Sequence, residues 1–515
     1  MNTVIDLLEE SFSLYKSNAA VRIYNNVWSY GELHSLSNTI AKFLLEKGIQ
    51  KGDRVAVLMN KSIYLYAAII GIMKSGGVYV HLETKAPPLR LAKMLEDIDP
   101  FSVFIDHIFI SRYQESQQYL ERSFKTILLD DLEQNKYEQI DFEGVSVTVK
   151  PNFPSVSSED LAYIFFTSGS SGIPKGVMIT HGNLYYYVKW FITSFYVSPE
   201  EVISGLHATL SDASVSDMFS TFCSGATLGV YPEEVIFPRN ILQLTYDYGI
   251  TKLYLISSGL NILVKSGLIQ PKLLKNLKDV FFGGETLPVN ALIELINMFP
   301  HTKFHNCYGP TETTIWISVH TFHKKPNPEE RILPVGFPLP GHRFILDNTD
   351  FSEGKNKGEL IIFGPQVGAG YWNDPEKTDR AFGVNKQGER FYRTGDITSF
   401  DPERGYFIHG RKDNQIKFRG YRIELGEIEH AVSMLSFIKE NIVIPIYKEG
   451  EVEGMKLVYT AERECEKEIL MNLRKNLPNY MVPKYFVRLE KFPKNKTNKI
   501  DRAQIKEKYG NFEGN

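Results

Sequence analysis

Leu161–His181 reads LAYIFFTSGSSGIPKGVMITH, a run of small residues enclosed by two apolar stretches. The first stretch, Leu161–Phe166, predicts a buried strand, and Val177–Ile179 predicts a second one. Between them, glycines let backbone N–H groups approach an anion, hydroxyls add donors, and Lys175 adds a positive charge. We therefore expect a loop that binds a polyphosphate.

Two other interpretations of this loop fit less well. A Walker A loop, GxxxxGK[ST], would need glycine at Pro174 and serine or threonine at Gly176. A flexible linker is rarely flanked this closely by two apolar strands, and Pro-Lys-Gly is poor linker chemistry.

The composition is that of an ordinary globular protein. The chain has 515 residues, of which 43% are hydrophobic and 23% charged, so it has ample material for several large cores. A net charge of −3 gives no electrostatic case for binding nucleic acid or an anionic membrane. The three cysteines form no CxxC pair, which argues against a disulfide framework or a zinc site and fits a reducing cytoplasm. The first residues carry acids early and lack a signal pattern, and the longest apolar run is too short to span a bilayer.

Apolar runs of strand length alternate with segments of helical periodicity through the first part of the chain. Strand, helix and strand follow one another at Arg54–Met59, Ser62–Lys74 and Val78–Leu82, an order typical of a parallel doubly wound α/β sheet. After about Gly336, short strands with frequent glycines dominate instead. The predicted units are a large core at 1–412, made of α/β subdomains at about 1–150 and 151–335 and a β-rich, barrel-like subdomain at 336–412, and a small α+β unit at 413–515.

Short motifs along nearly the whole chain resemble those of the adenylate-forming superfamily, which includes acyl-CoA synthetases, luciferases and the adenylation domains of nonribosomal peptide synthetases. TSGSSGIPKG resembles the phosphate loop of that family. The chain departs from the family at His81, where proline is usual, and at Asn498, where glycine is usual. The other matching motifs, in chain order, are WSYGEL (Trp28–Leu33), MKSGGVYVHLE (Met73–Glu83), NCYGPTETT (Asn306–Thr314), GELIIFGPQVGAGYWNDPEKTDRAF (Gly358–Phe382), YRTGDI (Tyr392–Ile397), GRKDNQIKFRGYRIELGEIE (Gly410–Glu429), LPNYMVP (Leu477–Pro483) and FPKNKTNKIDR (Phe492–Arg502).

This resemblance implies an enzyme that uses ATP and Mg²⁺. It assigns Mg²⁺ binding and a catalytic role to Glu312, the ribose hydroxyls to Asp396 and a further ribose or phosphate contact to Arg411. Lys499, which on its own pattern would be a solvated lysine, matches the catalytic lysine. Tyr308 would stack on adenine, although the residue pattern alone also fits a core tyrosine at a turn. The remaining nucleotide-binding positions are Thr167, Ser168, Gly169, Ser170, Ser171, Gly172, Lys175, Gly284, Glu285, Thr286, Asn306, Cys307, Gly309 and Thr311.

Asp413 matches the hinge between the large and small domains of the family. The family uses two orientations of the mobile small domain. In one, the segment with Lys499 enters the site for adenylation. In the other, the segment around Gly420 faces the site for thioester formation.

Asp212 is the residue that separates amino-acid-activating members from acyl-CoA ligases. An ammonium group buried in a pocket needs a counter-charge, and the resemblance gives that role to this carboxylate. Asp217 is a competitor one helical turn later, but the register of DASV favours Asp212. One further pocket position is either Tyr254 or Leu255. The other predicted substrate-binding residues are Ala213, Ser216, Phe281, Gly283, Cys307, Ile315 and Trp316.

Apart from Asp212 and Lys499, the predicted pocket residues carry no charge, and two of them are bulky aromatics. We therefore predict a small uncharged amino acid. The combination of Gly283, Ile315 and Trp316 resembles pockets for glycine, which places glycine first, followed by alanine, cysteine, serine or proline. The expected reaction forms aminoacyl-AMP and pyrophosphate, then passes the aminoacyl group to the phosphopantetheine thiol of a separate carrier protein. The chain ends soon after Arg502, so we expect a free-standing enzyme. We also expect a cytoplasmic protein, from its cysteine usage, and a monomer. The alternatives are an acyl- or aryl-CoA ligase, a D-alanine–carrier protein ligase, and a non-catalytic relic of the fold.

Overall fold

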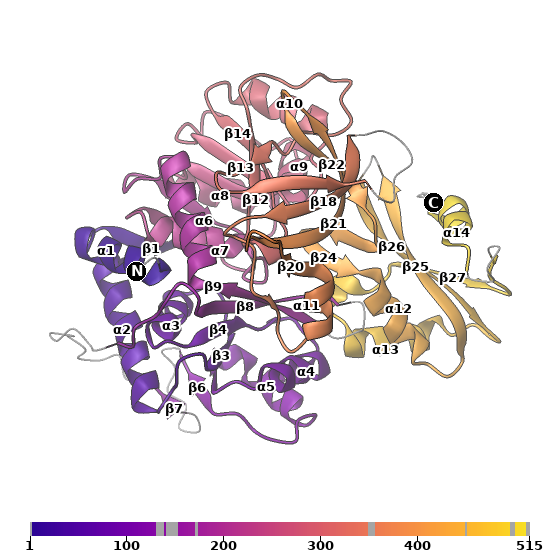
Figure 1. Cartoon of the computed structure of the whole chain (residues 1–515), viewed down its shortest axis with the longest axis horizontal. Coiled ribbons are helices and arrows are strands. Elements are labelled where there is room, and N and C mark those ends of the chain that lie inside the picture. Colours follow the sequence, from indigo (N-terminus) through magenta and orange to yellow (C-terminus); the bar gives the residue numbers. More distant parts are fainter. Residues whose placement is uncertain are drawn as a thin grey trace.

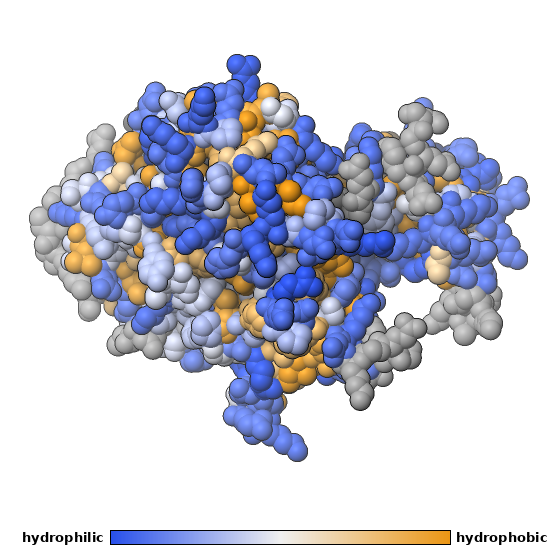
Figure 2. Space-filling view, turned by 90° about the horizontal axis from the view of Figure 1, so that it is seen from above, coloured by the Kyte–Doolittle hydropathy of each residue, from blue (hydrophilic) through white to orange (hydrophobic). Residues whose placement is uncertain are grey.

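The fold is mixed α/β, as predicted, with a large N-terminal part and a smaller C-terminal part (Figure 1). The structure is a computed structural model that describes residues 3–129, 138–140, 153–169, 174–348, 356–448, 451–494 and 500–510. In the space-filling view, hydrophilic side chains cover most of the visible face of the smaller part (Figure 2). Among the described residues, no helix has the length and apolarity needed to cross a membrane.

The first sheet has eight strands within the described chain and is mostly parallel. Its order is β19-β9-β8-β4-β3-β5-β6-β7, with β4 parallel to both β3 and β8, and β9 antiparallel to β8. The strands are β3 (Arg54–Leu58), β4 (Val78–His81), β5 (Ser102–Ile105), β6 (Thr126–Leu128), β7 (Glu138–Gln139), β8 (Leu161–Thr167), β9 (Lys175–Thr180) and β19 (Gly370–Tyr371). The helices between them are α2 (Tyr30–Glu46), α3 (Ile63–Lys74), α4 (Pro88–Ile98) and α5 (Ile110–Gln117).

The second sheet has nine strands in the part of the chain that the structure describes, in the order β16-β15-β14-β13-β12-β10-β11-β1-β2. The strands are β1 (Ala19–Ile23), β2 (Asn26–Ser29), β10 (Val202–Gly205), β11 (Thr227–Val230), β12 (Lys252–Ile256), β13 (Asp279–Gly283), β14 (Lys303–Tyr308), β15 (Ser318–Phe322) and β16 (Phe337–Pro338). The associated helices are α1 (Val4–Leu14), α6 (His181–Ser194), α7 (Ala213–Phe222), α8 (Pro238–Tyr248), α9 (Ser257–Lys265) and α10 (Val289–Met298).

The expected boundary near residue 150 does not separate the two sheets. Strands β1 and β2 precede that boundary but belong to the second sheet, where β1 pairs with β11 and β2 pairs with β1. Strands β8 and β9 follow the boundary but belong to the first sheet. Helices α6 and α7 lie between the sheets, because α6 contacts β8 and β9 while α7 contacts β10 and β11. The described ends of the phosphate loop, Thr167 on β8 and Lys175 on β9, therefore belong to the first sheet.

Helix α3 shows how the interior is assembled. It begins after Ser62, whose hydroxyl accepts a hydrogen bond from the Leu65 N–H, and nearly all of its residues are buried. A Cβ at Gly71 would lie 2.8 Å from Ile40 of α2, so glycine allows the two helices to approach closely. Lys74 is fully buried and forms an ion pair with Glu9 of α1 at 2.7 Å. Three N-terminal helices are therefore joined by both packing and charge.

The last part of the chain contains the predicted β-rich unit and the small α+β unit. The former has β17 (Arg343–Asp347), β18 (Lys357–Phe363), β20 (Phe382–Val384), β21 (Arg390–Asp401), β22 (Gly405–Arg411) and α11 (Pro375–Ala381). The latter has a hairpin of β23 (Gln415–Phe418) and β24 (Tyr421–Glu424), the sheet β25 (Ile438–Lys448), β26 (Glu451–Ala461) and β27 (Tyr485–Leu489), and the helices α12 (Leu425–Ser433), α13 (Glu466–Asn476) and α14 (Arg502–Tyr509). We keep the predicted division at Asp413 as a proposal.

Candidate active site

A cavity of about 620 Å³ lies where the strand ends of the large part meet the β23–β24 hairpin. The hairpin contributes Lys417, Arg419, Gly420, Tyr421 and Arg422 to its wall. The cavity brings together many of the residues predicted from the sequence. These are Thr167, Ser168, Asp212, Ala213, Gly283, Gly284, Cys307, Gly309, Thr311, Ile315, Trp316, Asp396 and Arg411.

Several predicted residues do not line the cavity wall. Ser216 is buried and shares a hydrogen bond of 2.6 Å with Tyr187, and Asn306 donates to the Pro334 carbonyl at 2.8 Å. Thr286 is exposed to solvent. Ser170, Ser171, Gly172 and Lys499 lie outside the described residues, so their predicted roles stay predictions.

Asp396 is the centre of a buried polar cluster beside the cavity. The Tyr308 hydroxyl donates to its carboxylate at 2.5 Å, and the Arg411 guanidinium donates at 2.8 Å. Arg411 also pairs with Asp413 at 2.6 Å. Burial and the neighbouring Asp396 charge raise the pKa of Tyr308 well above its usual value, so its hydroxyl keeps its proton. The cluster fixes the position of a carboxylate whose oxygens can also accept hydrogen bonds from two hydroxyl groups.

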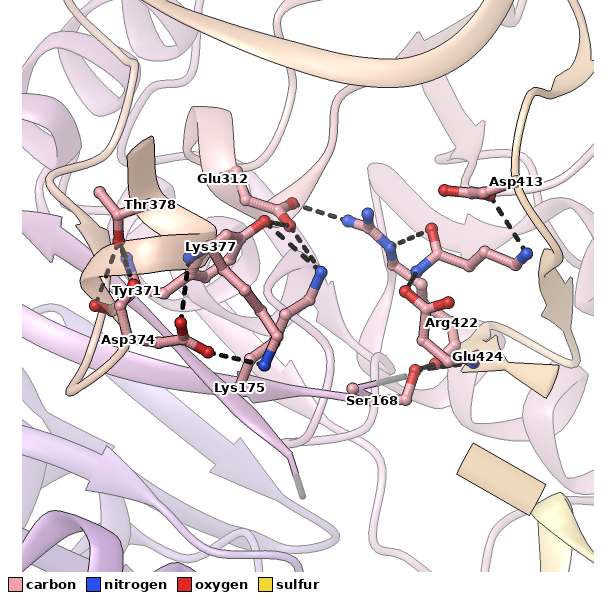
Figure 3. A network of polar contacts seen from close by, with 12 residues as sticks. Ser168, Lys175, Glu312, Tyr371, Asp374, Lys377, Thr378, Asp413, Arg422 and Glu424 are labelled. Carbon is pink, nitrogen blue, oxygen red and sulfur yellow. Dashed lines mark hydrogen bonds and ion pairs between the residues drawn. The ribbon is translucent and has the colours of Figure 1, made fainter. Parts of the chain in front are cut away.

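Glu312 lies in the short turn after β14 and is fully buried (Figure 3). Arg422 donates to one of its oxygens at 2.6 Å, the Tyr371 hydroxyl donates to the other at 2.8 Å, and the Lys175 ammonium is 3.6 Å from that second oxygen. Burial alone would raise the pKa of Glu312, but the Arg422 and Lys175 charges lower it well below its usual range. The carboxylate is therefore ionised, with both oxygens engaged by the protein.

The chemistry of Glu312 fits a magnesium ion. Mg²⁺ is usually held by one or two carboxylates together with phosphate oxygens. Across the described residues, no group of three or more His, Cys, Asp or Glu side chains is arranged to hold a metal. Glu312 would be a protein ligand of this ion, and Mg²⁺ would supply positive charge beside the phosphates. In the arrangement seen here, the Arg422 guanidinium contacts the same carboxylate.

The C-terminal part also contacts the start of the phosphate loop. The Ser168 hydroxyl donates to the Arg422 carbonyl at 2.6 Å and accepts from the Glu424 N–H at 3.0 Å (Figure 3). The Gly169 N–H donates to Glu427 of α12 at 3.3 Å. On the other side of the hairpin, the Gly420 N–H donates to Glu285 at 2.8 Å. The backbone of the hairpin is thus hydrogen-bonded to side chains of the large part on both sides, to Ser168 on one and to Glu285 on the other.

A strained turn shapes the pocket near Ile315. Thr314 and Ile315 have φ values of 57° and 70°, a left-handed conformation that β-branched residues rarely adopt. The buried Gln366 side chain holds the turn, because its amide donates to the carbonyls of Thr314 and Trp316, both at 3.0 Å. Gln366 was not among the site residues predicted from the sequence. It lies in the GPQVGAGYW part of a family motif, and that motif is the sequence signal from which a role in the site could have been predicted.

The two candidate aspartates have different surroundings. Asp217 contacts the His207 ring at 2.9 Å and accepts the His207 backbone N–H at 3.3 Å, so its carboxylate has partners inside the protein. Asp212 lines the cavity just before α7. Burial raises the pKa of Asp212, and a hydrogen bond from Thr311 opposes that shift. Of the two, Asp212 is the carboxylate that faces the cavity.

An aromatic cluster closes the cavity behind Trp316. The Trp316 ring stacks on Phe281 with centroids 5.8 Å apart and an interplanar angle of 11°, and it meets Tyr254 edge-on at 5.7 Å. Phe281 and Tyr254 are fully buried and do not line the cavity, whereas Leu255 does. A Cβ at position 283 would lie 2.2 Å from the Cys307 carbonyl oxygen, so Gly283 cannot be replaced without moving the backbone.

The cations of the hairpin were not predicted as site residues. Lys417 lines the cavity with its ammonium 5.9 Å from the centroid of the Tyr308 ring, and burial lowers its pKa. Arg422 contacts Glu312, as described above. Both belong to the GRKDNQIKFRGYRIELGEIE motif, which was expected to face the site in one orientation of the small domain.

Comparisons with known proteins place the chain in one family. Residues 8–372 match the family described as AMP-binding enzyme. Zwittermicin A synthase ZmaJ of Bacillus cereus is 32% identical over 521 residues, covering 98% of this chain and 95% of that protein. Tyrocidine synthase 1 of Brevibacillus parabrevis is 31% identical over 518 residues; the match covers 98% of this chain but only 45% of that protein.

Among solved structures, the Vibrio cholerae adenylation domain AlmE, in complex with glycyl-adenosine-5′-phosphate, has a TM-score of 0.85 at 22% identity. That match covers 98% of this chain and 97% of AlmE, and it shows a common fold. The chain therefore belongs to the AMP-binding enzyme family, the AMP-forming ligases whose members include the adenylation domains of nonribosomal peptide synthetases.

Proposed function

We propose that the chain adenylates a small uncharged α-amino acid, glycine first and then alanine, cysteine, serine or proline. The aminoacyl-AMP formed with release of pyrophosphate is then attacked by the phosphopantetheine thiol of a separate carrier protein, which releases AMP. The observation that carries the proposal is Asp212, a carboxylate in the cavity wall that accepts a hydrogen bond from Thr311. An α-ammonium group is the ligand charge that such a carboxylate favours.

The aromatic cluster supports a short side chain. Because Trp316 is packed against two other buried rings, it cannot move aside without a packing cost. A long side chain on the bound amino acid would have to displace the Trp316 ring. A charged side chain would find no counter-charge among Trp316, Ile315 and Leu255 and would lose its hydration. The complex of AlmE with glycyl-adenosine-5′-phosphate shows that this fold accommodates a glycyl group.

The contacts of Asp396 and Glu312 support the use of MgATP. Asp396, held in place by hydrogen bonds from Arg411 and Tyr308, is suited to two ribose hydroxyls. Glu312 would hold Mg²⁺ beside the phosphates once Arg422 has withdrawn. No protein nucleophile is required, because positioning and charge stabilisation account for most of the catalysis of such phosphoryl-group chemistry.

The position of the hairpin supports a second, thioester-forming step. In this arrangement the segment around Gly420 lies at the cavity, and Arg422 contacts the carboxylate that Mg²⁺ would need. Such an arrangement is suited to the state after pyrophosphate and its metal have left. Rotation about Asp413 would then withdraw the hairpin and bring the segment with Lys499 to the site.

Substitution of Asp212 tests the amino-acid assignment. In amino-acid-dependent pyrophosphate exchange, Asp212→Asn should raise the KM for glycine by roughly 30- to 100-fold, because about 2–3 kcal/mol of charged interaction is lost. The KM for ATP should stay within about twofold. Asp379→Asn, an exposed aspartate on α11, is the matched control. Equal losses for both substrates would mean that Asp212 is structural. Activity only with acids that lack an amine would favour an acyl- or aryl-CoA ligase, and preference for D-alanine would favour a D-alanine–carrier protein ligase.

A further inference from the structure

A buried polar cluster lies behind the closed end of the cavity, on strands β13 and β14. Side chains two residues apart on a strand point to the same face, so Asp279, Phe281 and Gly283 share one face of β13. In the parallel register, His305 of β14 pairs with Phe281. Cys307, two residues later on β14, pairs with Gly283, and both of these residues line the cavity. Along β13, Phe281 therefore lies between Asp279 and the cavity.

Hydrogen bonds on both sides of the His305 ring fix its orientation. Its Nε2 atom is 3.0 Å from one carboxylate oxygen of Asp279, and its Nδ1 atom is 2.9 Å from the hydroxyl of Thr321 on β15. The other Asp279 oxygen accepts a hydrogen bond from Lys252 of β12 at 2.5 Å. The imidazole is thus held between two strands that flank its own interactions with Phe281.

The protonation states of the cluster decide which atoms donate. Burial raises the pKa of Asp279, but the His305 hydrogen bond and the Lys252 charge lower it below its usual value, so the carboxylate is ionised. An ionised carboxylate only accepts hydrogen bonds, which makes His305 Nε2 a donor. Burial lowers the pKa of His305, so the ring is neutral and its Nδ1 atom accepts the Thr321 hydroxyl.

The same imidazole supports the aromatic cluster. His305 stacks on Phe281 with ring centroids 4.4 Å apart and an interplanar angle of 17°. Phe281 in turn stacks on Trp316, which lines the cavity. Phe195 meets both His305 and Phe281 edge-on, with centroid distances of 5.0 Å and 4.8 Å. His305 and Phe281 are both buried, so neither ring can tilt without displacing a neighbour.

A polar cluster gives this position more than bulk. Burying the charges of Lys252 and Asp279 is unfavourable unless they are well paired, so filling the space with them has a cost in stability. An aliphatic side chain would fill the space behind Phe281 but could change rotamer. Two hydrogen bonds hold the His305 ring at one tilt, and that tilt fixes the plane of the ring that stacks on it.

We propose that His305, held by Asp279 and Thr321, is a positioning residue that sets the depth of the amino-acid pocket through Phe281 and Trp316. The proposal rests on the function proposed above, because it assigns the closed end of the cavity to the side chain of the bound amino acid. His305 does not line the cavity and acts through two stacked rings. Without the imidazole, Phe281 gains space toward β14 and Trp316 can follow it away from the bound amino acid.

Amino-acid-dependent pyrophosphate exchange by the full chain, with glycine and with leucine, tests the proposal. His305→Ala should raise the ratio of kcat/KM for leucine to that for glycine by at least about fivefold, because the space behind Phe281 becomes available to the pocket. The KM for ATP should stay within about twofold, because the nucleotide contacts are elsewhere. His305→Gln, which keeps a planar group and a donor toward Asp279, should change the ratio by less than about twofold.

Thr321→Val provides a milder variant in case His305→Ala does not fold. It removes the hydroxyl that donates to His305 Nδ1 and leaves the imidazole in place. We expect the leucine-to-glycine ratio to rise by about two- to threefold, as the loss of one hydrogen bond predicts.

Phe304→Leu is the matched control. Phe304 directly precedes His305 on β14 and is fully buried, but its side chain belongs to the hydrophobic core on the other face of the sheet from Phe281. This variant should lower the unfolding temperature without changing the leucine-to-glycine ratio.

A readout that needs no activity separates this proposal from the proposed function. In the chain labelled with 5-fluorotryptophan, the ¹⁹F signal of Trp316 is assigned by its loss in Trp316→Leu. His305→Ala should shift or broaden that signal, and Phe304→Leu should leave it in place. If the unmodified chain exchanges pyrophosphate with no amino acid, the proposed function is wrong, and the ¹⁹F signal still decides whether His305 holds Trp316.

Two results would overturn the proposal. A folded His305→Ala chain with an unchanged leucine-to-glycine ratio and an unchanged Trp316 signal would mean that the other rings hold the pocket without the imidazole. An equal rise of the ratio in Phe304→Leu would mean that general loosening of the sheet, and not His305, changes the depth of the pocket.

Discussion

Arg422 and Glu312 form an ion pair at 2.6 Å across the boundary between the small C-terminal part and the large core, although 110 residues separate them in the chain. Glu312 is fully buried, so this contact joins the two parts in the interior rather than at the surface. Because the same carboxylate is the proposed magnesium ligand, Arg422 and Mg²⁺ should compete for it.

Substitution of Arg422 should therefore affect the two half-reactions unequally. Arg422→Gln removes the guanidinium that holds the hairpin on Glu312, and breaking a buried pair costs about 3 kcal/mol or more. We expect transfer of the aminoacyl group to a thiol to slow by roughly 100-fold in single-turnover measurements. Pyrophosphate exchange should change by less than about threefold.

Arg474→Gln is the matched control, because Arg474 is an exposed arginine of α13 in the same small part and lies outside the cavity wall. It should leave both half-reactions nearly unchanged. If Arg422→Gln slowed pyrophosphate exchange as strongly as transfer, the ion pair with Glu312 would not be specific to the second step.

Trp316 should set the size limit of the amino acid. Trp316→Leu removes the ring that stacks on Phe281 and leaves space at the closed end of the pocket. Each methylene that a pocket admits or rejects is worth about 1–3 kcal/mol. We expect the ratio of kcat/KM for leucine to that for glycine to rise by at least about tenfold in an exchange assay. An unchanged ratio would show that the side chain of the bound amino acid does not point toward Trp316. Trp190→Leu, outside the cavity wall, controls for general loosening of the aromatic cluster.

The ion pair between Glu9 and Lys74 should contribute pH-dependent stability. Burial raises the pKa of Glu9, but the hydrogen bond from His34 and the charge of Lys74 lower it to about 2. A carboxyl whose folded pKa is depressed contributes stability above its unfolded pKa of about 4.5 and loses it as the pH falls toward 2. Glu9→Gln should therefore lower stability at pH 7 by about 1–2 kcal/mol, a discounted value because Glu9 is partly exposed.

The measurement is the difference in unfolding temperature between Glu9→Gln and the unmodified chain at pH 7 and at pH 3. The difference should shrink at pH 3. Glu10→Gln, an exposed neighbour on the same helix, should show almost no loss at either pH. A difference for Glu9→Gln that persisted unchanged at pH 3 would mean that the ion pair is not its cause.

Local sequence signals predicted many elements closely, but they did not predict the pairing of distant strands. The predicted strand at Arg54–Met59 is β3 and the predicted helix at Ser62–Lys74 is α3, each within one residue of the predicted bounds. Strands β1 and β2 were not predicted, and neither was the pairing of β1 with β11, some 200 residues later. Helix α8 was also missed, because its sequence PRNILQLTYDY is largely polar and the burial of one face depends on neighbours distant in sequence.

The site was predictable where one motif supplies one residue, and not where two parts must meet. Asp212, Trp316 and Asp396 were placed by their motifs and line one cavity. Contacts such as that between Arg422 and Glu312 depend on the orientation of the small part, which no local pattern encodes. The role of Gln366 depends on the left-handed turn that it holds, and that conformation is visible only in three dimensions.

The most direct test of the central claim compares glycine with acetate in pyrophosphate exchange. The two differ by the amine that Asp212 is proposed to bind. We predict exchange with glycine that requires ATP and Mg²⁺, weaker exchange with alanine, cysteine, serine and proline, and none with acetate. Exchange that depends on acetate or another acid without an amine, and that no amino acid supports, would contradict the account.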